Sequence, residues 1–402
     1  MMHAFSLDPR DILFFRDARP MGGSDAGRGA RLPRPDQLHT ALLSAFFARW
    51  PERQDWEGDE HTFRRRTPDN RDRTHDRNDD SSLRFGALRV VGPFVADSRG
   101  VPFFPTPLDW NMRVVPLPNG TDLPNPLVAG FLPVSREKRI VPPLVPAGLF
   151  ADYLSGRFPD LGGISIPFGA ERTIQTAIDP ASGTSDDGRL FQAEYLRLAP
   201  GARLVFLASC VIHPKGGGPD VDVFARPDAP DVVQIGGQGG LARLSSTAFS
   251  IPESTAVPSR RIRWTLLTLA LFNAGWRPGW VDEASGRVRL KCGDTGRRPG
   301  ESRAAWRARI AEAPEFPTAR LVAARIGKPE AFSGWDVLQN APKPTVLAVP
   351  AGSCYVFDCD SPDEAAALAS TLSGMHPHSD LFGEKGFGIG VCSFVSDSRS
   401  TT

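Results

Sequence analysis

Apolar and polar residues alternate in many short runs along this chain, and such runs are typical of half-buried strands. Between the runs lie turns drawing on the 39 glycines and 38 prolines of the sequence. The pattern therefore predicts a strand-rich protein with few helices. The expected strands cover residues 3–7, 172–178, 190–198, 202–210, 232–235, 286–292, 320–326, 346–349, 354–359 and 390–395, with a hairpin inside 83–109.

Helical spacing is confined to three places. Leu38, Leu42 and Phe46 fall on one face after Pro35, which predicts a helix there. A charged segment at 302–311 is also expected to be helical. The third helix, 361–374, should begin with a capping box formed by Ser361 and Glu364. Residues 261–269 fit either a buried helix or a central strand, and we favour the strand.

A change of composition divides the chain. Residues 51–82 are rich in charge and almost free of apolar side chains, so we interpret them as a disordered insertion. Around this insertion the strand pattern forms two β-rich halves. We expect an N-terminal domain at 1–250 and a C-terminal domain at 251–402, each with a sheet and a glycine-rich loop near arginines.

Charge and cysteine content narrow the possible functions. The net charge of +1 provides no overall field for a polyanion, so a nucleic-acid surface would have to be local. Arginine outnumbers lysine, which suits contacts to phosphate and bases but also fits a biased genome composition. The five cysteines lack CxxC spacing, which favours a reducing compartment. No apolar run approaches the ~20 residues of a membrane span, so we expect a cytoplasmic protein without membrane contact.

A glycine-rich loop at 383–390 is the most suggestive local feature. Gly383, Gly386 and Gly388 leave a backbone whose N–H groups could approach an anion. Lys385 adds a cation, and Phe387 adds a flat face for a base. The alternative is a tight turn without a ligand. The order helix, loop, strand excludes a dinucleotide-binding fingerprint, which needs the reverse.

No catalytic centre emerges from the motifs. His376 and His378 lack further ligands of metal-binding spacing, so we expect no metal and no cofactor. A metal-independent ribonuclease would need a general base. The histidines in ordered-looking segments are His3, His39 and His213, and a structural role is the commoner one for a histidine in such a place.

Several longer stretches carry a resemblance to a known family. Residues 7–20 read LDPRDILFFRDARP, and Pro33-Arg34-Pro35 precedes a helix. Together with the matches that follow, they resemble the family of the third Cmr subunit, in the RAMP superfamily of CRISPR-associated proteins. The remaining matches are residues 92–97, 104–109, 172–174, 188–191, 236–237, 275–278, 349–353 and 383–390. Gln238-Gly239 departs from the acidic residue and arginine that relatives often carry there.

This resemblance implies an α+β fold of tandem ferredoxin-like (RRM-related) domains with long β-rich and loop insertions. It also implies a non-catalytic, RNA-binding subunit of a type III-B complex in antiviral defense. The subunit would hold the repeat-derived 5′ handle of the CRISPR RNA and cap the base of the complex. Its other partners would be the large polymerase-palm subunit and a backbone RAMP subunit.

The residues expected to contact the RNA combine the resemblance with the charge pattern. The first group is Arg16, Arg19, Arg34, Lys385 and Phe387, with Gly383, Gly386 and Gly388 allowing close approach. The second group is Arg136, Lys138, Arg139, Arg172 and Arg243, of which 136–139 could equally be a solvated turn. Two other functions remain open: a metal-independent RAMP endoribonuclease that processes repeat RNA, and a β-rich assembly protein whose glycine loops serve only packing.

Overall fold

We describe the protein from a computed structural model. The residues described are 2–15, 27–29, 31–57, 84–117, 123–135, 141–178, 182, 184–214, 218–293, 301–336, 341–342, 344–374 and 376–395. Most of the expected insertion at 51–82, and the residues Arg16, Arg19, Arg136, Lys138 and Arg139, lie outside this range. None of the helices in the described part of the chain has the length and apolar character needed to span a bilayer.

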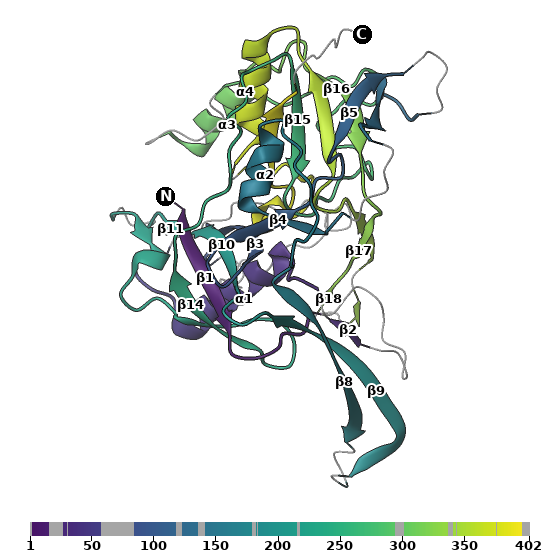
Figure 1. Cartoon of the computed structure of the whole chain (residues 1–402). Helices are drawn as coiled ribbons and strands as arrows, with labels where there is room; N and C mark the ends of the chain where they lie inside the picture. Colours follow the sequence, from purple (N-terminus) through teal and green to yellow (C-terminus); the bar gives the residue numbers. More distant parts are fainter. Residues whose placement is uncertain are drawn as a thin grey trace.

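The first half of the chain forms a seven-stranded antiparallel sheet in the order β13-β14-β1-β10-β3-β4-β7 (Figure 1). The expected hairpin inside 83–109 is present, because β3 pairs with β4. The strands are β1 (His3–Pro9), β3 (Arg89–Ala96), β4 (Pro102–Pro105), β7 (Leu144–Pro146), β10 (Arg203–Ser209), β13 (Val232–Gln234) and β14 (Leu241–Ser246).

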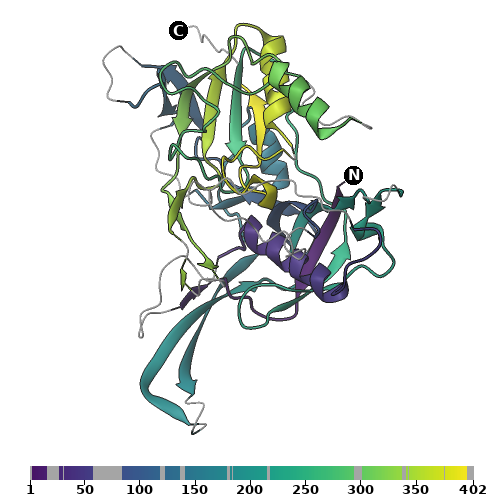
Figure 2. The ribbon, with the colours of Figure 1, turned by 180° about the vertical axis from the view of Figure 1, so that it is seen from behind.

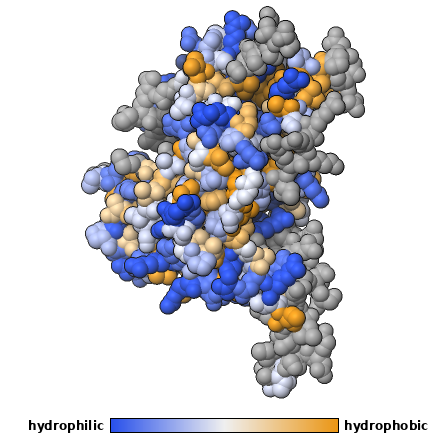
Figure 3. Space-filling view, in the orientation of Figure 1, coloured by the Kyte–Doolittle hydropathy of each residue, from blue (hydrophilic) through white to orange (hydrophobic). Residues whose placement is uncertain are grey.

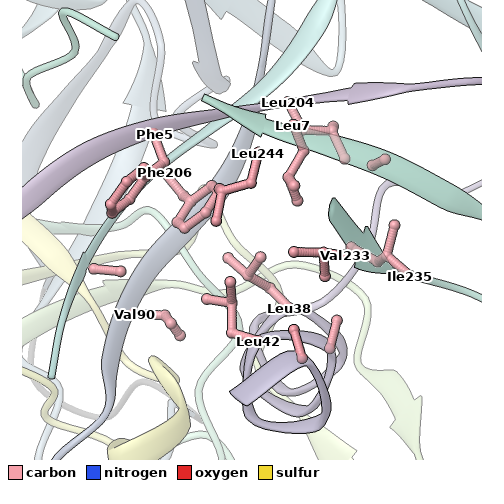
Figure 4. Close-up of a cluster of buried hydrophobic side chains, with 14 of the residues drawn as sticks. Phe5, Leu7, Leu38, Leu42, Val90, Leu204, Phe206, Val233, Ile235 and Leu244 are labelled. Carbon is pink, nitrogen blue, oxygen red and sulfur yellow. The ribbon is translucent and has the colours of Figure 1, made fainter. Parts of the chain in front are cut away.

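Helix α1 (Pro35–Arg49) packs on one face of this sheet. Leu38, Leu42 and Phe46 are fully buried on the helix side, as their spacing predicts. They meet apolar side chains from the sheet strands, including Leu7 and Phe206, in the core drawn in Figure 4. The helix starts where Arg34 donates its backbone N–H to the Gln37 side chain at 2.8 Å.

The second half forms a four-stranded antiparallel sheet in the order β16-β21-β15-β22. Its strands are β15 (Arg261–Leu266), β16 (Arg320–Arg325), β21 (Cys354–Asp358) and β22 (Gly390–Phe394). Residues 261–266 are therefore a central strand, as favoured. Helix α4 (Pro362–Leu372) covers one face, while α3 (Arg303–Glu312) lies beside it at the edge of the molecule (Figure 1).

The predicted capping box of α4 is half correct. Ser361 accepts a hydrogen bond from the backbone N–H of Glu364 at 3.1 Å. The Glu364 carboxylate, however, points away from the helix start and accepts the backbone N–H groups of Thr318 and Ala319, at 2.8 and 3.1 Å. It therefore joins α4 to the segment that leads into β16.

Two long strands leave the body of the molecule as an arm. β8 (Phe168–Ile178) and β9 (Ser185–Leu198) pair along their length, and β2 (Gly27–Gly29) adds to β9 in parallel. Figures 1 and 2 show the arm extending away from both sheets. Near its base, Arg172 pairs with Glu194 at 2.8 Å, and Arg197 pairs with Glu171. The charges at the base thus neutralise one another across the strands.

The remaining short elements decorate these bodies. They are β5 (Met112–Pro116), β6 (Ala129–Pro133), β11 (Val211–Ile212), β12 (Val221–Asp222), β17 (Glu330–Phe332), β18 (Trp335–Asp336), β19 (Ala341–Pro342), β20 (Val346–Ala348), and the short 3₁₀ turns η3 (Val223–Ala225) and η4 (Gly383–Lys385). The face in Figure 3 is mainly hydrophilic, with small hydrophobic groups. The exposed apolar residues include Val128, Leu132 and Val134, at the end of the molecule that carries β5 and β6.

Helix α2 (Ala147–Leu154) lies between the two halves and was not predicted. The eight-residue segment follows a proline-rich stretch in which no helical spacing is visible. Its Phe150 and Leu154 are fully buried with Phe94 of the first sheet and Val391 of the second. The two halves therefore share a continuous apolar core around this helix.

A buried polar network joins the halves at the same place. On β15, Ile262, Trp264 and Leu266 face α4, whereas Arg263 and Thr265 face α2. The Arg263 guanidinium donates to Asp109 at 3.0 Å and lies 4.0 Å from the centre of the Tyr153 ring. Asp109 also accepts hydrogen bonds from the Tyr153 hydroxyl at 2.6 Å and the Cys354 thiol at 3.0 Å.

One predicted strand is wrong. Residues 286–292 make only isolated bridges, among them Val288 with Val281 and Arg287 with Arg320. The segment is held by these scattered contacts, with Val288 fully buried under the second sheet. Its alternating pattern reflects one buried side chain rather than a paired strand. In all, the fold is a mixed α/β structure of mostly antiparallel sheets with few helices.

Removing the carboxylate of Asp109 should destabilise the whole molecule. The Asp109→Asn variant leaves the charge of Arg263 buried without a counterion, because both side chains are almost fully buried, at 1% and 5% exposure. We expect a loss of about 3–5 kcal/mol in the free energy of unfolding, measured by urea denaturation. The matched control is Asp152→Asn, which breaks an exposed pair with Arg157 and should cost less than ~1 kcal/mol. Equal losses in the two variants would contradict the role assigned to this network.

Candidate nucleic-acid interface

The glycine-rich loop lies against the start of helix α1. Gly386 has φ +88°, and a Cβ added there would come within 2.6 Å of the Val90 carbonyl oxygen and 3.3 Å of the Pro35 Cβ. The Thr268 hydroxyl donates to the Gly386 carbonyl at 2.8 Å. Figure 2 shows the yellow C-terminal turn beside the purple helix. Two segments from opposite ends of the sequence therefore meet between the two sheets.

Most amides of the loop are already used within the fold. The N–H of Gly386 donates to Gly383 at 2.9 Å, and that of Gly388 donates to Leu269 at 2.7 Å. Ile389 donates its N–H to the Thr268 hydroxyl at 3.0 Å. The expectation that Gly386 and Gly388 leave room for a ligand is wrong, because the space next to them holds Val90, Pro35 and Ser379. Gly383 is less crowded, with Pro377 3.3 Å from an added Cβ.

Phe387 does not offer a stacking face. Its ring is fully buried, and it packs edge-on against Phe332 with the ring centres 5.3 Å apart. The prediction that a base stacks on Phe387 is wrong, because the Phe387 ring is part of the small hydrophobic core beneath the loop. The half-buried neighbours Phe332 and Phe382 surround it.

Arg34 and Lys385 both lie on this aromatic group. The Arg34 guanidinium is 4.9 Å from the centre of the Phe332 ring, and the Lys385 ammonium is 5.0 Å from that of Phe382. Asp36 accepts from Nε and Nη2 of Arg34 at 3.0 and 3.2 Å. The Arg34 guanidinium is therefore held over the Phe332 ring, and its charge is partly neutralised by Asp36. Its side chain is 19% exposed.

Arg89 completes the positive region, and the neutral side chain of His39 lies close to both Arg89 and Lys385. Burial, together with the nearby charges of Lys385 and Arg89, lowers the pKa of His39 to about 3, so the ring is neutral at pH 7. Arg89 sits at the start of β3, with Nη1 donating to the carbonyls of Gly86 and Leu88. The cations Arg34, Arg89 and Lys385 thus come from α1, β3 and η4.

The second-group arginines in the described range lie elsewhere. Arg172 is on the arm, where it pairs with Glu194. Arg243 is exposed on β14, opposite Asp8 in the pairing with β1. Near it, the second glycine cluster packs on Phe14, because a Cβ on Gly236 would lie 2.8 Å from the Phe14 carbonyl oxygen. Gln238, the departure noted in the sequence, accepts a hydrogen bond from Tyr195 at 2.7 Å.

The histidines considered as general bases each have a hydrogen-bonding partner within the fold. His3 pairs with Asp222 at 2.6 Å, and His213 pairs with Asp220, both beside the β11–β12 hairpin. His378 bonds to the Thr371 carbonyl at 2.8 Å, and burial lowers its pKa to about 4. Within the described residues, no group of three or more His, Cys, Asp or Glu side chains is arranged to hold a metal ion.

Comparison with known proteins shows to which family the chain belongs. A family model described as "CRISPR-associated protein (Cas_Cmr3)" matches residues 5–392, which is nearly the whole chain. A search of curated proteins finds no match. The match to the family establishes that the chain is a CRISPR-associated protein. It belongs to the Cmr3 family, of the type III-B system, and the resemblance seen in the sequence is confirmed.

Solved structures of low sequence identity are similar over most of their length. A chain in the cryo-EM structure of the type III-B Cmr-beta complex bound to cognate target RNA and AMPPnP shares 15% identity, with TM-score 0.44, covering 88% of this chain and 86% of that one. A chain of the type III-A Csm3-Csm4 subcomplex shares 9%, with TM-score 0.37 and coverages of 89% and 93%. A chain of the Csm1-Csm4 cassette with pppApA shares 15%, with TM-score 0.31 and coverages of 69% and 80%.

A side chain at position 386 should disrupt the junction. In Gly386→Ala, the new methyl group is on a residue with a left-handed backbone and also collides with the Val90 carbonyl oxygen. We therefore expect a larger decrease in melting temperature than the left-handed strain alone would cause. Gly374→Ala supplies that comparison, because Gly374 has φ +83° with nothing within 4 Å of an added Cβ. If thermal denaturation gives the same melting temperature for both variants, the packing of the loop on β3 is not as described.

The neutral His39 should make stability depend on pH. Its pKa is about 3 in the folded chain, against the ordinary value of 6.5 that applies when the chain is unfolded, so the unfolded chain binds a proton that the folded one rejects. Stability is therefore lost as the pH falls from 6.5 towards 3, by about 2 kcal/mol at pH 5. Urea denaturation at pH 7 and pH 5 should show a smaller decrease for His39→Gln than for the wild type. Replacing the exposed His376 by Gln should leave the decrease unchanged.

Proposed function

We propose that this Cmr3-family protein is a non-catalytic CRISPR RNA-binding subunit that holds the repeat-derived 5′ handle at the base of a type III-B effector complex. The observation that carries the proposal is the meeting of the loop at 383–390 with the start of α1. Cations from α1, β3 and η4 gather where the two sheets adjoin. Such a place is suited to a fixed single strand, which is held through phosphates and exposed bases.

The charge balance of the region fits reversible binding of a polyanion. Arg34 is paired with Asp36, and Arg31 with Glu330 at 3.1 Å, so two arginines are kept in position without RNA. A phosphate would therefore enter a region already organised by its own ion pairs, which lowers the entropy lost on binding.

The finer features of the assignment belong to the same proposal. The two sheets are the cores of tandem ferredoxin-like domains at 1–250 and 251–402, with the arm and the β5–β6 hairpin as insertions. The neighbouring subunits are the large polymerase-palm subunit and a backbone RAMP subunit, in the cytoplasm. Within the 5′ handle site, we retain Arg34, Lys385 and Gly383 as contacts. Arg16 and Arg19 stay in the first group of proposed RNA contacts, and Arg136, Lys138, Arg139, Arg172 and Arg243 stay in the second.

An endoribonuclease of the same superfamily is the alternative, and its general base would be His3, His39 or His213. The low pKa of His39 makes its ring a weak proton acceptor at pH 7. His3 on β1 and His213 beside the β11–β12 hairpin are each paired with an aspartate, Asp222 and Asp220. These observations favour a binding role for the loop region.

Reversing one charge in the loop should weaken RNA binding in a salt-dependent way. The Lys385→Glu variant of the full-length chain should bind the single-stranded 5′ repeat segment of CRISPR RNA about tenfold more weakly. The slope of log affinity against log salt should fall by about 0.7, the value for one lost single-strand phosphate contact. The measurement is fluorescence anisotropy across a salt series, with the segment identified by sequencing RNA that copurifies after co-expression with repeat RNA.

Lys291→Glu is the matched control, because this substitution makes the same change in net charge at a place away from the junction. Lys291 lies near α3, with its Nζ 4.0 Å from Oε1 of Glu315. It should bind RNA like the wild type. RNA affinity that does not change with salt would contradict the proposal. A metal-independent cut in unprocessed repeat RNA that disappears on replacing His3, His39 or His213 would support the nuclease instead.

A further inference from the structure

The burial of Phe387 leaves open which side chain meets a base in the candidate site. Two phenylalanines of the same cluster reach the surface. Phe332 lies on β17 and Phe382 immediately precedes η4, and both are half-buried. Their ring centres are 5.3 Å apart, and each contacts the buried Phe387 ring. Phe387 therefore supports two rings that are themselves accessible to a ligand.

Phe382 has a backbone conformation that disfavours a bulky side chain. Its φ of +58° and ψ of 21° lie in the left-handed region, where glycine or asparagine is the usual residue. The loop around it contains glycines at 383, 386 and 388, yet position 382 carries a phenyl ring. A strained backbone at a half-exposed aromatic residue is a reason to look for a role of the ring itself.

The charges around the ring match the parts of one nucleotide. The Lys385 ammonium lies 5.0 Å from the centre of the Phe382 ring, and the Arg34 guanidinium lies 4.9 Å from that of Phe332. Because the Lys385 ammonium lies over the Phe382 ring, a base that stacks on this face would displace the ammonium, and the phosphate of the same nucleotide would then be within its reach. Aromatic rings flanked by cations are the usual means of holding single-stranded nucleic acid without reading its sequence.

We propose that Phe382, braced by Phe332 and Phe387, is the stacking surface for one base of single-stranded RNA, with Lys385 and Arg34 beside it. This inference rests on the proposed function, because it assigns a base contact within the same site. Phe382 thereby takes the stacking role that the buried Phe387 cannot have. The contrasting view is that Phe382 only fills the small core around Phe387, in which case the ring has no interaction with a base.

A double-mutant cycle between protein and RNA separates the two views. Full-length wild type and Phe382→Gly are titrated with the single-stranded 5′ repeat segment, both intact and with one base at a time replaced by an abasic site. Glycine suits the left-handed backbone, so the fold should persist without the ring. We expect Phe382→Gly to bind intact RNA roughly 5- to 150-fold more weakly, the range for loss of one stacked base. For RNA abasic at one particular position, wild type and variant should bind equally.

Further variants exclude a purely structural effect. Phe382→Leu keeps an apolar side chain without a ring and should lose affinity like Phe382→Gly, whereas Phe382→Tyr should bind as the wild type does. Phe249→Leu changes a half-buried phenylalanine in another core and should leave affinity unchanged. Thermal denaturation identifies any variant that fails to fold.

The outcomes distinguish this inference from the proposed function. If Phe382→Gly and Phe382→Leu bind intact RNA as tightly as the wild type, or lose the same factor with every abasic RNA, the stacking role is wrong while the RNA-binding function stands. If the wild type binds RNA without dependence on salt, the proposed function itself fails.

Discussion

The buried carboxylate of Asp109 is the constraint on which the arrangement of the two halves depends. It belongs to the first half of the chain and accepts hydrogen bonds from Tyr153 of α2 and from Arg263 and Cys354 of the second sheet. Burial raises the pKa of both the Tyr153 hydroxyl and the Cys354 thiol, so both stay protonated and act as donors. A charged pair that is buried away from water has to be fully hydrogen-bonded. All of these hydrogen bonds can form in only one relative position of the two sheets.

That single position also creates the candidate RNA site. Gly386 reaches Val90 and Pro35 only when the second sheet is docked on the first. The cations Arg34 and Lys385 are then carried by the cluster of Phe332, Phe382 and Phe387. The glycines of the loop serve this close packing, since their amides are mostly engaged with other parts of the chain. The half-buried rings of Phe332 and Phe382, with the cations over them, are what remains for a ligand.

Local patterns in the sequence were sufficient for most of the elements. The spacing of Leu38, Leu42 and Phe46 specified α1, and Ser361 specified the start of α4. Helix α2 was missed because eight residues after a run of prolines give too few turns to show a period. The partnership of Asp109 with Arg263 could not be foreseen, because it joins positions far apart in the chain with no local signal for either.

The candidate site was predictable in location but not in detail. Arg34 and Lys385 were selected from charge beside a helix start and beside glycines, and the structure brings them to the same cluster. Phe387 was selected because it lies among glycines, yet it is buried, since neighbours without side chains let its ring turn inward. The left-handed backbone of Phe382 has no signature in the residue itself, so only the coordinates could single it out.

The order in which the ribosome makes this chain gives the junction between loop and helix one more consequence. Arg34 is synthesised long before Lys385, so the region that contains both cannot form until the chain has been made through Lys385. Premature termination or proteolytic cleavage before η4 would remove Lys385 while leaving every strand of the first sheet in place. Any ligand that requires both residues would thus be captured only after the chain has been made through Lys385.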